Sequence, residues 1–187
     1  MTKTKYLFLL GIISTMTLTS CSNDDENPPL INEEEVITTV IATFTNGDNI
    51  VTMTSYDEDG DGPVAPEVTV SGNFVAGETY TGTIRFVNQS VAPEEEITEE
   101  IHEESDEHQI FFQQNGLGTF SYTDQDENGN PVGLSFSFTA SPNSVTGNLT
   151  ITLIHEPDKF AEGVANGNIA NAGGSTDAEV VFPVVIE

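Results

Sequence analysis

The sequence has very few basic residues. Four of its 187 residues are Lys or Arg, against 31 Asp or Glu, and the formal net charge is −27. Such a chain repels nucleic acid and anionic lipid headgroups, so neither is expected as a binding partner. Intramolecular salt bridges cannot neutralise so many carboxylates, and divalent metal cations are the remaining source of positive charge.

Cysteine and tryptophan are equally scarce, with one cysteine and no tryptophan in the chain. A single cysteine excludes an internal disulfide. Without tryptophan the chain lacks the usual exposed aromatic platform for sugars, which disfavours carbohydrate binding. There is no G-x-S-x-G or comparable nucleophile motif, and paired carboxylates are too abundant to indicate a glycosidase. We therefore do not expect an enzyme.

The first 20 residues have the pattern of a bacterial lipoprotein signal peptide. Lys3 and Lys5 precede an apolar run over residues 7–17 that is too short to span a bilayer. The segment Leu18-Thr19-Ser20-Cys21 matches a lipoprotein cleavage site, so we expect Cys21 to carry a lipid that anchors the mature chain to a membrane. The alternative is an ordinary secretory signal with an incidental cysteine. Removing residues 1–20 leaves two cations, Arg85 and Lys159, against 31 acids, a formal charge of about −29.

Residues 21–34 are acidic and contain two prolines, which predicts a disordered tether. Its first residues, Cys-Ser-Asn-Asp-Asp-Glu, resemble the acidic export tag of Bacteroidota lipoproteins. That resemblance implies display on the outer face of the outer membrane. A merely flexible acidic linker, on a lipoprotein that faces the periplasm, is the alternative.

Residues 35–187 alternate apolar and polar side chains in short segments, which predicts an antiparallel β-sandwich of Ig-like character with seven to nine strands. A barrel is the alternative. The Asn46-Gly47 pair favours a hairpin. The predicted strands cover residues 36–44, 50–56, 68–70, 80–87, 110–114, 119–122, 132–139, 149–154 and 179–186.

One segment, Glu94 to Phe112, breaks this alternation. It contains nine acidic residues and two of the three histidines. Ile97 and Ile101 are four residues apart, which predicts a short acidic helix with one buried face, followed by a strand that begins near His108. A solvated acidic face without further function is the simplest interpretation of such a charge run.

The histidines predict a transition-metal site. His155 ends a strand on the same face as Leu149, Ile151 and Leu153, and His108 begins another strand. Imidazole and carboxylate ligands suit zinc or a similar ion. We expect His108 and His155 as ligands, Glu104 as the carboxylate, and His102 as an outer ligand. The alternative is that these histidines are ordinary residues at strand boundaries.

Two loops have the D-x-D-x-[DN]-G spacing of calcium-binding loops. Neither has the bidentate glutamate or the flanking helices of an EF-hand, and the same residues also dominate ordinary turns. The candidate calcium ligands are Asp57, Asp59 and Asp61 in one loop and Asp124, Asp126 and Asn128 in the other.

Four segments carry a resemblance to a known family: residues 33–39, 57–63, 106–109 and 155–174. The chain resembles small Bacteroidota lipoproteins labelled "type 1 periplasmic binding fold superfamily protein", which are associated with TonB-dependent receptors. The resemblance implies an outer-membrane receptor as partner. The label also implies two doubly wound α/β lobes, but the sequence has no alternating βα units, so we expect the β-fold.

Together these features predict a lipid-anchored accessory protein that binds a divalent metal cation, with zinc or a similar transition metal as the cofactor. The first alternative is a structural or adhesive surface module stiffened by calcium. The second is a haem-binding lipoprotein with His108 and His155 as axial ligands, which the scarcity of basic partners for the propionates disfavours.

Overall fold

The structure is a computed structural model that describes residues 36–58, 60 and 63–187. The predicted signal peptide, Cys21, the tether, Asp59 and Asp61 lie outside the described residues. Those expectations therefore stay predictions.

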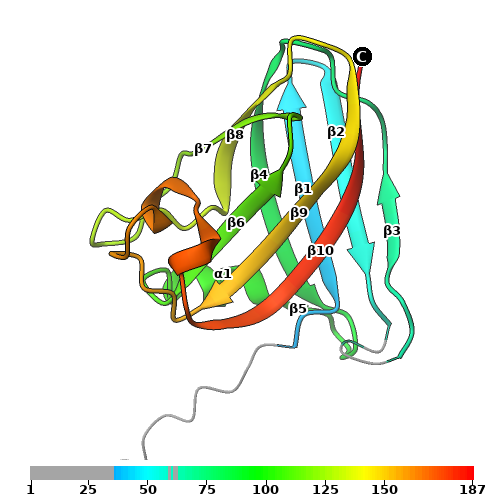
Figure 1. Cartoon of the computed structure of the whole chain (residues 1–187). Coiled ribbons are helices and arrows are strands. Elements are labelled where there is room, and N and C mark those ends of the chain that lie inside the picture. Colours follow the sequence, from blue (N-terminus) through cyan, green and yellow to red (C-terminus); the bar gives the residue numbers. More distant parts are fainter. Residues whose placement is uncertain (1–35, 59, 61–62) are drawn as a thin grey trace, which may run out of the picture. The chain divides into compact units, whose positions relative to one another are not determined.

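The described residues form two antiparallel sheets that face each other (Figure 1). One sheet has the strand order β3-β2-β1-β4-β8-β7, with the short β5 beside β4, and the other has the order β10-β9-β6. The strands are β1 (Thr39–Asn46), β2 (Asn49–Tyr56), β3 (Glu67–Val70), β4 (Thr79–Asn88), β5 (Glu95–Glu96), β6 (His108–Gln114), β7 (Gly118–Tyr122), β8 (Ser135–Ala140), β9 (Val145–His155) and β10 (Ser175–Ile186). The prediction of an all-β, sandwich-like fold is confirmed, and each predicted strand overlaps one of these.

Alternating side chains of both sheets fill the space between them. Phe44 lies at the centre of this core, with ring centroids 5.0 Å from Phe74, 5.3 Å from Phe136 and 5.9 Å from Phe138, all edge to face. Aromatic pairs prefer this geometry because the positive ring edge meets the negative face. The predicted hairpin joins β1 to β2, and Gly47 adopts a φ of 57°, which a residue without a Cβ tolerates best.

The predicted helix is also present. It is α1 (Ile97–Glu103), and Ile97 and Ile101 are its buried residues, while Glu99, Glu100 and Glu103 face solvent. Two short 3-10 helices, η1 (Val164–Asn166) and η2 (Ile169–Asn171), lie in the connection between β9 and β10. After α1 the chain turns through residues 104–107 and enters β6 at His108.

Candidate metal site

His108 and His155 lie directly opposite each other in neighbouring strands. His108 is the first residue of β6 and His155 the last of β9, and the two are paired in the antiparallel register. Both follow the inward stripe of their strands, since the next inward pair is Ile110 with Leu153. His108 is fully buried and His155 is 6% exposed. The imidazole rings stack with centroids 4.8 Å apart and planes 14° from parallel.

Asp177 completes the group because of an irregularity in β10. The pairing of β10 with β9 shifts register between Thr176 and Ala178, so Asp177 is the extra residue of a β-bulge. A bulge bends the strand and redirects side chains. Regular alternation would place Asp177 on the outer face with Glu179 and Val181. Instead its side chain is 1% exposed.

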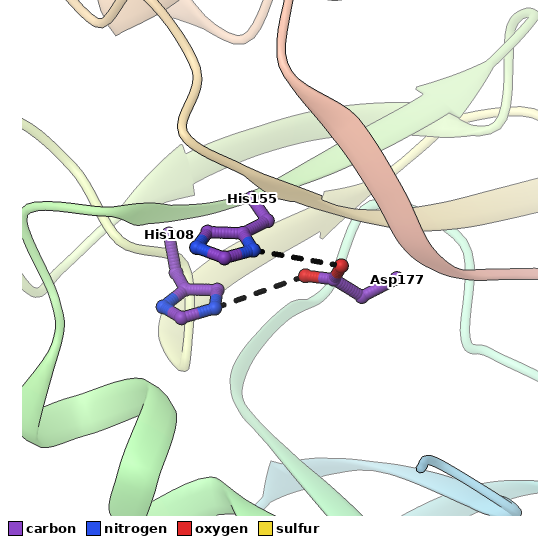
Figure 2. Close-up of side chains that lie close together, drawn as sticks. All are labelled: His108, His155 and Asp177. Atoms are coloured by element: carbon purple, nitrogen blue, oxygen red, sulfur yellow. Dashed lines mark ion pairs between the residues drawn. The ribbon is translucent and has the colours of Figure 1, made fainter. Parts of the chain in front are cut away.

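The carboxylate of Asp177 faces both imidazoles (Figure 2). Its Oδ2 atom lies 3.7 Å from Nε2 of His108, and its Oδ1 atom lies 4.0 Å from Nδ1 of His155. One donor atom from each of the three side chains lies within 4.8 Å of the others. Nitrogen and oxygen ligands of a tetrahedral zinc ion lie about 3.4 Å from one another, given bond lengths of about 2.0–2.2 Å. The two nitrogen–oxygen separations are close to this value, and the nearly parallel rings would have to tilt for their in-plane lone pairs to converge on one ion.

A backbone carbonyl group orients the His108 ring so that Nε2 faces Asp177. Nδ1 of His108 lies 3.1 Å from the carbonyl oxygen of Glu104. A carbonyl oxygen only accepts hydrogen bonds, so Nδ1 donates, and in a neutral ring Nε2 then has no proton. Nε2 of His108 and Oδ2 of Asp177 thus face each other at 3.7 Å, a nitrogen and an oxygen that could both act as metal ligands.

The other two predicted ligands lie elsewhere. Glu104 contributes its backbone carbonyl to His108, but its carboxylate belongs to neither group of metal-ligand side chains found among the described residues. His102 is exposed on α1, where it lines a shallow cavity of about 440 Å³ with Thr83 and Ile84. The carboxylate beside the two histidines is that of Asp177, not that of Glu104.

In the second candidate calcium loop, protein groups already contact both aspartates. Asp124 accepts hydrogen bonds from the backbone N–H groups of Gly133 and Ser135, each at 2.8 Å. Asp126 accepts from the backbone N–H groups of Asn128 and Asn130 and from the ammonium of Lys159 at 3.0 Å. The lysine ammonium thus takes the place that a bound cation would have beside Asp126.

Lys159 is almost completely buried, and its ammonium also donates to the carbonyl oxygens of Ser105 and Pro131. Desolvation lowers the pKa of Lys159, because here it outweighs the attraction of Asp126. Desolvation also acts to raise the pKa of Asp126, but the hydrogen bonds from Asn130, Lys159 and Asn128 outweigh it, and that pKa is lowered. Through Ser105 this ion pair holds the turn that precedes His108.

The first candidate calcium loop is described only in part. Asp57 and Gly60 line a cavity of about 260 Å³ between β1, β2 and β10, and Asp177 and Glu179 line it as well. Asp59 and Asp61 lie outside the described residues, so this calcium prediction stays a prediction.

No family model matches the chain, and the comparisons with curated proteins and with solved structures gave no significant match. In the described part of the chain, every helix is too short or too polar to cross a bilayer.

Proposed function

We propose that this protein binds one divalent transition-metal cation, such as zinc, through His108, His155 and Asp177. The observation that supports the proposal is the hydrogen bond that orients the His108 ring. Its Nδ1 donates to a backbone carbonyl while Nε2 faces a buried carboxylate 3.7 Å away. Metal-binding histidines characteristically donate their other ring N–H to a carbonyl or carboxylate in this way, which orients the ring and raises its basicity.

The ligand types narrow the class of metal. Two imidazoles and one carboxylate suit zinc or a neighbouring transition metal, whereas calcium and magnesium prefer sites made of oxygen. Three protein ligands leave a fourth position for water or for a group of a partner. Such an incomplete set suits a protein that takes up an ion and later releases it.

We place this activity in a lipoprotein anchored through Cys21, which would present the ion to an outer-membrane receptor. The signal-peptide pattern, the acidic tag after Cys21 and the family resemblance support this part of the proposal. A strongly negative surface raises the local concentration of divalent cations, which favours capture of a scarce metal.

Titration of the metal-free protein with zinc, followed by calorimetry, tests the proposal. We expect one zinc ion per chain in the wild type and loss of that binding in His108→Ala/His155→Ala. His102→Ala, which changes the one histidine away from the group, is the matched control and should bind as the wild type does. Equal zinc binding by all three proteins would contradict the proposal.

A further inference from the structure

A second group of metal-ligand side chains adjoins the buried one. Glu107, His155 and Glu156 each offer a donor atom, and these atoms lie within 4.8 Å of one another. Oε2 of Glu107 lies 3.6 Å from Nε2 of His155, and the side chain of Glu107 is 47% exposed. Glu156 is exposed too. This outer group therefore faces solvent, whereas the group of His108, His155 and Asp177 is buried.

The register of the sheet builds the outer group. Glu107 directly precedes His108 at the beginning of β6, and Glu156 directly follows His155 at the end of β9. The backbone N–H of Glu156 donates to the carbonyl oxygen of Glu107 at 2.6 Å, so the two residues are held side by side beyond the histidine pair. Glu156 has a φ of 51°, a conformation that non-glycine residues adopt rarely.

His155 belongs to both groups and presents a different nitrogen to each. Its Nε2 faces Glu107, and its Nδ1 faces Asp177 at 4.0 Å. One imidazole ring thus lies between an exposed carboxylate and a buried one. We propose that Glu107, His155 and Glu156 form a loading site, through which a divalent cation passes on its way to His108, His155 and Asp177. This inference rests on the proposed function.

The chemistry of desolvation gives the outer group a role. A hydrated divalent ion cannot enter a buried site until it loses water, and each water is best replaced by a protein ligand as it leaves. The two exposed glutamates can bind the ion while it keeps part of its hydration shell. Nε2 of His155 then offers the first nitrogen ligand. As the ion moves inward it leaves Nε2 and the glutamates and binds Nδ1 of the same ring together with His108 and Asp177. The loading site therefore speeds both binding and release without changing the affinity of the buried site.

The experiment measures the rate at which zinc binds, by stopped-flow mixing with a zinc indicator, in the full-length mature protein. In Glu107→Gln/Glu156→Gln we expect the association rate constant to fall about 10-fold or more. The dissociation rate constant should fall by the same factor, because entry and exit share one path. The stoichiometry and the equilibrium affinity should equal those of the wild type.

Two control variants distinguish entry through the loading site from an effect of overall surface charge and from entry through the cavity that Glu179 and Asp177 line. Glu99→Gln/Glu103→Gln removes the same charge from exposed positions on α1 and should change both rates far less than Glu107→Gln/Glu156→Gln does. Glu179→Gln changes the rim of the cavity that Asp177 also lines, and should likewise have little effect.

The inference is overturned if the α1 variant slows binding equally, since bulk charge would then explain the effect. It is overturned if only Glu179→Gln slows binding, or if Glu107→Gln/Glu156→Gln weakens the affinity at an unchanged association rate. Zinc binding by the wild type with identical rates in every variant overturns the loading site alone. Absence of zinc binding by the wild type overturns the proposed function with it.

Discussion

His108 and His155 are a cross-strand pair at the end of the β6–β9 ladder where β6 begins and β9 ends. Their rings stack, and the carboxylate of Asp177 faces both. The three residues lie up to 69 positions apart in the sequence, and the pairing of the strands together with the β-bulge at Asp177 brings them together. This relationship yields a prediction about the third residue of the group.

Replacing Asp177 with Asn should weaken zinc binding strongly, because the amide lacks the negative charge that balances the cation. Loss of an outer-shell partner of a metal ligand costs about 10–100-fold in affinity, and loss of a direct ligand should cost at least that much. Calorimetric titration provides the measurement. Asp48→Asn makes the same chemical change in the exposed β1–β2 turn and should bind zinc with wild-type affinity. Similar affinities for both variants would remove Asp177 from the site.

Replacing Lys159 with Met should destabilise the fold by about 3–5 kcal/mol, because Asp126 is then a buried charge without its cation. Denaturant unfolding measures the loss. The matched control is Arg85→Met, since the Arg85–Glu96 ion pair is exposed, with 53% of the Arg85 side chain accessible. Exposed pairs contribute about 0–1 kcal/mol, so this variant should remain close to the wild type. Equal losses in the two variants would contradict the structural role of Lys159.

The stability of the protein should fall in acid partly because of Asp126. Its pKa is lowered in the folded state from an ordinary value of 3.8. The folded state therefore binds the proton less readily than the unfolded chain does, and the stabilisation is present above the unfolded pKa and lost as the pH falls through the folded one.

Free energies of unfolding measured from neutral pH down to acid pH test the contribution of Asp126. The difference between the wild type and Asp126→Asn should be largest near neutral pH and should shrink below a pH of about 4. A difference that does not change with pH would mean that the ionised carboxylate contributes nothing.

Replacing Gly82 with Ala should destabilise the sandwich by about 1–3 kcal/mol, the usual cost of overpacking a core. A Cβ at this position would lie 2.1 Å from Cε2 of Phe136, its cross-strand partner. Phe136 cannot move away easily, because its ring packs against Phe44 and Phe112. Thermal unfolding measures the effect. Gly72→Ala is the control, since no atom lies within 4 Å of its added Cβ, and it should unfold as the wild type does. Equal unfolding temperatures would show that Phe136 adapts.

Alternation along the chain was sufficient to predict most of the fold. Where one face of a strand is buried, the period of two separates apolar from polar side chains, as it does at Leu149, Ile151 and Leu153. The same rule placed His155 on the inner face. The four-residue spacing of Ile97 and Ile101 likewise predicted the one α-helix of the described residues. These features are local, so they are readable from the sequence.

The composition of the candidate site was readable only in part. The inward position of His155 and the position of His108 at the start of a strand follow from the sequence, but their pairing depends on which strands become neighbours. Asp177 could not be found by alternation, because that rule assigns it to the outer face with Glu179. A β-bulge reverses its direction, and the bulge exists only through the pairing of β10 with β9.

The contact between Lys159 and Asp126 is likewise visible only in the tertiary structure. The spacing of Asp124 and Asp126 made them candidate calcium ligands, and it carries no sign that a lysine 33 residues later contacts Asp126. The sequence by itself therefore determined the strands, the helix, the excess of acids and the candidate histidines. Only the tertiary structure decided which carboxylate meets the histidines and which carboxylate meets a lysine, because both contacts join segments distant in the chain.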